Sequence, residues 1–318
     1  EDSVMHVGLD DSYGLNEDFT HNDYYPASAL QTPIYYLLTI DLYNTLDFII
    51  RFTNRTVDCY QKSKYGKKDT QKVTINLMDS ESITQYLSSA LWCTYRGMGS
   101  PVVPYRVQSI HMALEKFLLE AADRYETDVI ESILQSILAK STSASLTAVV
   151  SSIVLAHPNK FWKTALILFK TIEFFHIDSV RCMNEFQVKS LYELSYSLNK
   201  HLTEERLKTC SDQHRESCLE TLIVNYQLFG VNGFSDEEIY AVIDWHRDQS
   251  KSLRGESRTI RGIFLSRIDR RLFRPEIKKK DESRYEIELN PELTPDLAMY
   301  SQQAMQAHQD STKYITLG

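Results

Sequence analysis

The chain has 318 residues, of which 42% are hydrophobic and 25% are charged, and this composition is typical of a globular protein. The formal net charge of −8 argues against bulk affinity for nucleic acid or for an acidic membrane surface. Five cysteines, an odd number at irregular spacing, argue against a disulfide framework and favour a reducing compartment. Because the sequence starts with Glu1 and shows no signal peptide, we expect a piece of a longer cytoplasmic protein.

The N-terminal part of the chain predicts a loop, two helices and a strand. Residues 1–25 are acidic and aromatic without apolar periodicity, which indicates a lead-in segment. Apolar residues then recur at helical spacing in two runs within 28–60. After a lysine-rich break, apolar and polar residues alternate over 73–77, and this alternation predicts a short strand that leads into a turn. The helical pattern returns over 83–95.

The centre of the chain predicts four successive helices, which begin near Tyr105, Asp128, Ser143 and Asn159. Alternate starts are 38 and 31 residues apart. Helix-pair solenoids repeat every ~33 to 47 residues, so the spacing is close to theirs. No sequence motif is duplicated, however. We therefore predict a mainly α protein, an irregular helix-pair solenoid of the HEAT or TPR type with a small β-hairpin or strand insertion. A compact all-α bundle is the alternative.

The most apolar stretch, residues 143–176, raises the question of a membrane span. A spanning helix needs about 20 consecutive apolar residues. The run over 143–156 has fourteen residues, includes several serines, and ends at His157 and Pro158. The second half carries Lys163, Lys170 and Glu173, whose burial in lipid is costly. The pattern therefore predicts a helix hairpin buried in protein.

The C-terminal part predicts further helices over 186–198 and 204–229 and one from Ser235, which forms an S-x-x-E capping box with Glu238. Apolar periodicity is lost near residue 250. The sequence thus predicts three segments: an acidic lead-in over 1–25, an α-helical repeat domain over 26–250, and a less regular C-terminal segment over 251–318. The last segment combines a basic helix, the strand RYEIEL, a proline-bounded loop and a weak final helix.

Cys210, His214 and Cys218 are spaced four residues apart, as in some metal or redox sites. On a helix the Cα atoms of the two cysteines would be about 12 Å apart. A zinc–sulfur bond is ~2.3 Å long and a disulfide needs Cα atoms within ~7 Å. We therefore predict that no single metal ion binds all three side chains and that the cysteines are reduced.

The segment 254–280 holds ten lysines or arginines and three carboxylates, so its net charge is +7 and that of the remainder is −15. Arginine forks suit phosphate, but the same face could dock on the acidic remainder or be a solvated helix. The predicted partner-binding residues are Arg258, Arg261, Arg267, Arg270, Arg271 and Arg274. The chain has no P-loop, no Rossmann glycine motif, no HExxH zinc motif and no nucleophile elbow. No catalytic, cofactor-binding or metal-binding residue is predicted.

Several segments carry a resemblance: YPASALQTPIYYLL from Tyr25, LDFIIRFTNRTVDCY from Leu46, LWCTYRG from Leu91, SIHMALEKFLLE from Ser109 and SASLTAVVSSIVLAHPNK from Ser143. Over residues 25–271 the chain resembles a helical region of large bacterial STAND-type (AVAST-like) antiviral ATP-binding NTPases. The resemblance implies a cytoplasmic NTPase whose helical repeats sense a phage component and whose oligomerisation activates an effector. Neither a Walker A loop nor an effector domain is present here, so ATP would bind elsewhere in the full-length protein.

We therefore expect a non-catalytic helical scaffold or sensor that recognises a protein partner, which is a phage component or another domain of the same protein. A solenoid would expose a long surface for such a partner. Two alternatives remain open: a nucleic-acid-binding regulator that uses the segment 254–280, and an enzyme with an active site that follows no known motif. No membrane association is expected.

Overall fold

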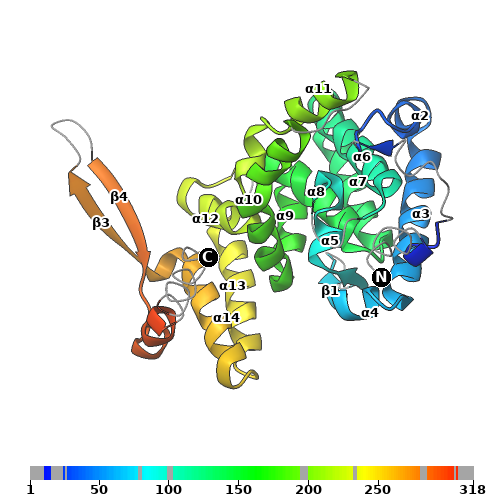
Figure 1. Cartoon of the computed structure of the whole chain (residues 1–318). Coiled ribbons are helices and arrows are strands. Elements are labelled where there is room, and N and C mark those ends of the chain that lie inside the picture. The colour runs from blue at the N-terminus through cyan, green and yellow to red at the C-terminus, as the bar shows by residue number, and fades with distance from the viewer. Residues whose placement is uncertain are drawn as a thin grey trace, which may run out of the picture. The chain divides into compact units, whose positions relative to one another are not determined.

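The computed structural model describes residues 11–15, 24–25, 27–77, 81–98, 103–193, 200–231, 235–279, 285–303 and 306. The fold is mainly helical with two small antiparallel hairpins (Figure 1). The chain forms two compact units, Glu1–Leu222 and Ile223–Gly318. The boundary that the sequence places near residue 250 falls in the turn between two helices of the second unit. Most of the predicted lead-in over 1–25 lies outside the described residues.

The first unit contains most of the helices. In chain order its elements are α2 (Ile34–Ile40), α3 (Leu42–Lys62), α4 (Gly66–Asp69), β1 (Gln71–Asn76), β2 (Ser82–Leu87), α5 (Ser89–Trp92), η2 (Thr94–Arg96), α6 (Tyr105–Arg124), α7 (Thr127–Lys140), α8 (Ala144–Ala156), α9 (Trp162–Phe169), α10 (Ile172–Glu193), α11 (Lys200–Thr209) and η3 (Gln213–Glu216). Helix α12 (Leu219–Phe229) contains the division between the units.

Helix α8 is the centre of the first unit. Every residue from Ala144 to Leu155 is buried, and α8 packs against α5, α6, α7 and α9 (Figure 1). Small residues at Ala144, Ala148 and Ser152 permit this close approach from several sides. The predicted buried hairpin is confirmed for α8 and α9, but the second helix ends at Phe169 and the end of the predicted stretch belongs to α10, which begins at Ile172. Among the described residues, no helix has the length and apolarity that a membrane crossing requires.

The predicted helix starts in the centre agree with the structure, where α6, α7, α8 and α9 begin at Tyr105, Thr127, Ala144 and Trp162. The predicted helix over 204–229 is wrong as one element. It is divided into α11, η3 and α12. The reason is Arg215, which a continuous surface helix would place in solvent but which is only 1% exposed in the structure. Its guanidinium reaches α6, and the backbone changes direction around it.

The predicted strand over 73–77 is confirmed as β1, which pairs antiparallel with β2 so that Val73 faces Gln85 and Ile75 faces Ile83. The predicted helix from Ile83 is wrong over 83–87, which form β2. Gln85 conceals the strand pattern because it is polar yet completely buried. Its side-chain amide donates to Ser141 O at 3.0 Å, and its carbonyl accepts from the Thr147 hydroxyl at 2.6 Å. Helix α5 starts only after Ser88, which caps it.

The second unit contains α13 (Asp236–Ser250), α14 (Gly255–Ile268), η4 (Arg270–Leu272), β3 (Phe273–Lys279) and β4 (Tyr285–Pro291). The predicted capping box is confirmed, with the Ser235 N–H donating to the Glu238 carboxylate at 3.2 Å. The predicted strand RYEIEL is confirmed as β4. The predicted basic helix is correct only for α14, because the residues from Phe273 pair with β4. Pro275 lacks an N–H and suits an edge strand better than a helix interior.

Candidate functional site

The six arginines predicted to bind a partner lie on three elements of the second unit. Arg258, Arg261 and Arg267 belong to α14, Arg270 and Arg271 to η4, and Arg274 to β3. The guanidinium of Arg270 is 3.1 Å from the Asp236 carboxylate, Arg271 Nη1 is 3.0 Å from Asp244 Oδ2, and Arg274 Nε is 2.9 Å from Glu292 Oε2. The six therefore do not share one helical face.

Asp269 explains how Arg271, although exposed, is held against its own unit. This carboxylate is completely buried and accepts from Arg271 Nε at 2.9 Å and from Arg247 Nη2 at 2.5 Å. The Arg271 guanidinium also lies 4.5 Å from the centre of the Tyr240 ring. Hydrogen bonds from Arg271 hold the pKa of Asp244 below its usual range. Arg271 thus pairs with two carboxylates of its own unit, Asp269 and Asp244.

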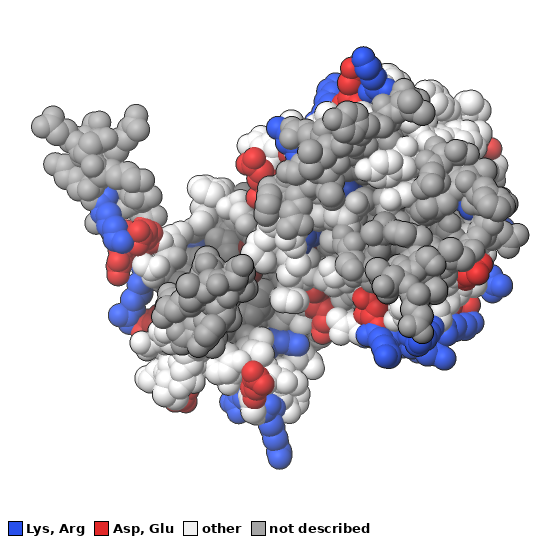
Figure 2. Space-filling model, in the orientation of Figure 1, with Lys and Arg blue, Asp and Glu red and all other residues white. Residues whose placement is uncertain are grey.

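Charges also alternate along the second hairpin. Basic and acidic side chains lie next to one another on β3 and β4 (Figure 2), and Lys278 Nζ is 2.6 Å from Glu288 Oε2. Nucleic-acid affinity depends on basic groups that are free to neutralise phosphates. Carboxylates already neutralise several of the basic groups here, so the segment offers fewer cations than its sequence charge indicates.

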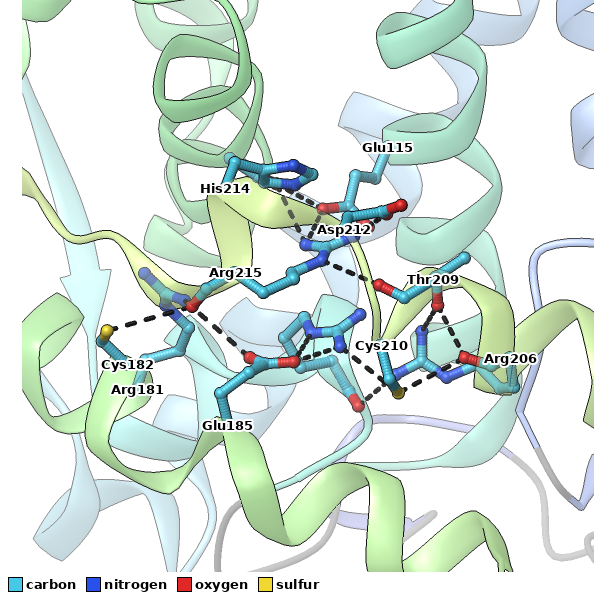
Figure 3. A network of polar contacts seen from close by, with 12 residues as sticks. Glu115, Arg181, Cys182, Glu185, Arg206, Thr209, Cys210, Asp212, His214 and Arg215 are labelled. Atoms are coloured by element: carbon cyan, nitrogen blue, oxygen red, sulfur yellow. Dashed lines mark hydrogen bonds and ion pairs between the residues drawn. The ribbon is translucent and has the colours of Figure 1, made fainter.

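The first unit contains a second group of charges, which sequence reasoning missed. We call it the arginine network and define it by four arginines and three carboxylates: Arg96, Arg181, Arg206, Arg215, Glu115, Asp178 and Glu185. Figure 3 labels five of them, Glu115, Arg181, Glu185, Arg206 and Arg215. Each of the four arginines is at most 1% exposed. Buried charges of this kind need partners, because an unpaired ion in the protein interior is very costly.

The network joins residues that are far apart in sequence. Arg215 Nη2 donates to Glu115 Oε2 at 3.0 Å, and Arg96 Nε donates to Glu185 Oε1 at 2.8 Å. Arg181 donates to Arg215 O at 2.9 Å, and Arg206 donates to Arg96 O at 2.6 Å. These contacts connect η2, α6, α10, α11 and η3, so the network fixes the mutual arrangement of five elements.

The pKa values of three groups in or near the network differ strongly from their ordinary values. Burial raises the pKa of Glu115, but the charge and hydrogen bonds of Arg215 outweigh burial and lower the pKa to about 2. Burial, helped by Arg215, lowers the pKa of His214 to about 3. Burial also lowers the pKa of His111 to about 4. At neutral pH Glu115 is therefore ionised and both histidines are neutral.

Two serine–histidine contacts resemble the pairing of a nucleophile with a base, which the enzyme alternative would require. His111 Nδ1 donates to Val107 O at 2.8 Å, so Nε2 accepts from the Ser145 hydroxyl at 2.9 Å. Ser152 Oγ lies 3.3 Å from His214 Nε2 and donates to Glu115. A nucleophile needs access to its substrate, but Ser145 and Ser152 are each only 1% exposed. These contacts therefore stabilise the interior.

The arginine network reaches the surface at a pocket of about 160 Å³ between α6, α11 and η3. Four basic residues line it, Lys116, Arg206, Lys208 and Arg215, together with four acidic ones, Glu115, Glu120, Glu205 and Asp212. Equal numbers of cations and carboxylates give no net field that would select an anion or a cation. The pocket therefore does not define a ligand class.

Cys210, His214 and Cys218 lie on different elements in the structure. Cys210 follows α11, His214 is in η3, and Cys218 precedes α12. Cys210 Sγ donates to Arg206 O at 3.3 Å. Within the part of the chain that the structure describes, no three His, Cys, Asp or Glu residues are arranged to hold a metal ion.

The candidate functional site is an apolar surface on the first unit. We define the α2–α3 apolar surface by five large side chains that point to solvent: Tyr36, Leu37, Ile40, Tyr43 and Phe48. Ile40 is 80% exposed and Tyr43 is 72% exposed. The cause is local sequence, because α2 reads IYYLLTI and buries only Ile34 and Leu38. A helix that is apolar all round is normally buried, so the exposed side of α2 is unusual for its sequence.

A groove adjoins this surface between α3 and α7. It has a volume of about 520 Å³, and its apolar lining includes Leu46, Ile50, Val129 and Ile133. Polar side chains also line it: Asp47, Asp128, Ser132, Ser136 and Lys140. The Asn54 amide donates to Lys140 O at 2.9 Å, which ties α3 to the last residue of α7. Tyr43 belongs to both the α2–α3 apolar surface and this α3–α7 groove.

Comparison of the sequence with protein-family models finds no match, and comparison with curated proteins finds none either.

Proposed function

We propose that this chain is a non-catalytic helical scaffold that recognises a protein partner through the α2–α3 apolar surface and the adjoining α3–α7 groove. The observation that carries the proposal is the exposure of Ile40 and Tyr43 together with an adjoining groove that apolar side chains partly line. Contiguous exposed apolar side chains mark interaction surfaces, and aromatic residues are enriched in the centres of interfaces.

The energetics favour a protein partner. Fully burying one large apolar side chain contributes about 1.5–3 kcal/mol, and five such side chains are exposed on two consecutive helices. Tyrosine anchors that fill pockets are typical hot spots. The polar residues lining the groove, Asp47, Asp128 and Lys140, would then fix the orientation of the partner rather than supply most of the affinity.

The wider biological role rests on the resemblance to STAND-type antiviral NTPases. On that basis we propose that the full-length protein is cytoplasmic, binds ATP through other parts of its sequence, and uses this chain to sense a phage component or to contact another of its own domains. The helix-pair spacing supports an irregular solenoid for α6 to α9. The burial of α8 on all sides supports the alternative of a compact bundle.

Site-specific photo-crosslinking tests the proposal. A photoreactive phenylalanine analogue replaces Tyr43 in the full-length protein, in the cells that make it, and a matched analogue replaces Phe229, which is 81% exposed in α12. We expect a reproducible protein adduct from position 43, none of the same mass from position 229, and loss of the adduct when Ile40→Glu is added. Identical adducts from both positions, or none from position 43, would contradict the proposal.

An ATP-turnover assay on the isolated chain distinguishes this proposal from the enzyme alternative. A scaffold without an active site should give no ATP turnover above that of a heat-denatured sample. Turnover that persists through purification and is lost with Ser145→Ala or Ser152→Ala would establish an enzyme instead.

A further inference from the structure

The α3–α7 groove follows one face of each of its two helices. On α3 the lining residues follow the pattern i, i+3, i+4 and i+7 from Tyr43, and on α7 one row of lining residues recurs at every fourth position: Asp128, Ser132, Ser136 and Lys140. Residues at this spacing lie one above the other on the same helix face. Asp128 and Lys140 are twelve positions apart, so at about 1.5 Å per residue the α7 wall is about 18 Å long. The groove is therefore about as long as three helical turns.

The two ends of the α7 wall carry opposite charges. Asp128 lies in the first turn of α7 and Lys140 in the last. Both side chains are exposed, and within the described ranges no other residue pairs with the carboxylate or with the ammonium group. Asp47, on the α3 wall, is already paired with Arg51 at 2.8 Å. A ligand along the α7 wall therefore meets an available negative charge at one end and an available positive charge at the other.

Exposed apolar side chains belong to both walls. Tyr43 of α3 is 72% exposed and Val129 of α7 is 46% exposed, whereas Leu46, Ile50 and Ile133 are each at most 6% exposed. The groove is therefore open to solvent. A small molecule there would leave a large part of its surface in water, although small-molecule sites bury about 70–90% of their ligand. A protein segment that also contacts the α2–α3 apolar surface suits the open groove better.

Backbone hydrogen bonding distinguishes a helical segment from an extended one. Both walls are α-helices, whose backbone N–H and C=O groups are bonded within each helix. An extended peptide would find no sheet edge to pair with, and its own backbone groups would lose water without gaining a partner. A helix satisfies its own backbone and presents apolar side chains at i, i+3, i+4 and i+7. The groove therefore favours a helix.

We propose that the α3–α7 groove binds an amphipathic helix of the partner, about three turns long, that lies antiparallel to α7. Acidic side chains in the first turn of this helix lie near Lys140, and basic side chains in its last turn lie near Asp128. Such end charges are favourable in helices generally, because they complement the helix dipole. The antiparallel orientation pairs opposite charges at both ends, whereas the parallel one pairs like charges. This inference rests on the proposed function, because it assigns the chemistry of a partner to the same surface.

A displayed peptide library tests the helix and its orientation. Yeast cells display peptides of about four turns that share an apolar stripe at helical spacing. Two positions in the first turn and two in the last are randomised among glutamate, lysine and glutamine, and the cells are sorted for binding to the labelled full chain. We expect enrichment of glutamate in the first turn and of lysine in the last. Synthetic peptides with these ends should bind about tenfold more tightly than peptides with the ends exchanged, and added salt should reduce the difference.

Two variants locate the binding site. The exchange of Asp128→Lys with Lys140→Asp should invert the enriched pattern, so that lysine comes first and glutamate last. Ser132→Arg places a long side chain in the groove and should abolish binding of the enriched peptides. Ser252→Arg, at an exposed position of the second unit, should leave that binding unchanged. Circular dichroism shows whether each variant folds, and the enrichment on the wild-type chain depends on none of them.

The proposal is overturned if sorting enriches no peptide, if the enriched ends show no charge preference or the reverse one, or if Ser132→Arg still binds the enriched peptides. Photo-crosslinking from position 43 separates this result from a failure of the proposed function. An adduct there without the charge preference leaves the proposed function standing and overturns only the helix. Charge-matched peptides without an adduct contradict the proposed function and still support a helix in the groove.

Discussion

Arg215 and Glu115 form a two-pronged ion pair in the interior of the first unit, although they are 100 residues apart in sequence. Arg215 comes from η3 and Glu115 from the middle of α6. Each is at most 3% exposed. The pair therefore contributes to stability in a way that depends on both partners, because removal of one leaves the other charged and buried.

We expect Glu115→Gln to lower the free energy of unfolding by about 3–5 kcal/mol, since it leaves the Arg215 guanidinium without its counter-charge. Urea denaturation followed by circular dichroism measures the change. Asp47→Asn is the matched control, because Asp47 pairs with Arg51 on an exposed helix face and such pairs contribute about 0–1 kcal/mol. Equal effects of the two substitutions would show that the network is not a buried electrostatic unit.

The depressed pKa of His111 predicts a pH dependence. The folded protein keeps His111 neutral down to a pKa of about 4, whereas the unfolded chain takes up a proton near 6.5. Lowering the pH through this window therefore favours the unfolded state, and His111 contributes a loss of up to ~1.4 kcal/mol per pH unit. Urea titrations between pH 7 and 4.5 should show a shallower slope for His111→Gln than for the wild type. Parallel slopes would contradict the assignment.

Overpacking should reveal the tight environment of α8. Ala148 is completely buried where α8 is surrounded by other helices. We expect Ala148→Leu to cost about 1–3 kcal/mol of unfolding free energy. Ala156→Leu is the control on the same helix, two turns later at its partly exposed end, and should cost less than about 0.5 kcal/mol. A measured loss near zero for Ala148→Leu would mean that α8 is not tightly enclosed.

Charge reversal in the second unit separates structural arginines from available ones. Arg271→Glu places a carboxylate against the buried Asp269 and should lower the unfolding free energy by about 1.5–3 kcal/mol. Arg258→Glu, on the exposed side of α14, should change it by less than about 0.5 kcal/mol. Thermal unfolding monitored by circular dichroism compares the two. If Arg271→Glu is as well tolerated as Arg258→Glu, Arg271 is free for a partner after all.

The sequence predicted the regular apolar elements and missed the polar interior. Helices α6 to α9 were found because their apolar residues recur at helical spacing and their starts follow short polar breaks. Gln85 and Arg215 misled the prediction, since hydropathy assigns both side chains to solvent and their buried partners lie dozens of residues away. The sequence also did not predict that Ile40 is exposed, because an apolar residue on a short helix does not indicate which side of the helix lacks a neighbour.

The buried amide of Gln85 has a consequence for how the first hairpin docks. Side chains alternate between the two faces of β2, so a slip of one residue would turn Gln85 outward and bring Thr84 or Tyr86 inward. The hydroxyl of either residue has its donor and its acceptor on one oxygen atom, whereas the Gln85 amide donates to the Ser141 carbonyl and accepts from the Thr147 hydroxyl through two separate atoms. A purely apolar strand would tolerate the slip more easily. This amide therefore selects one register out of several that hydrophobic contacts alone would allow, and a redesigned hairpin that lacked it would be free to dock in more than one alignment.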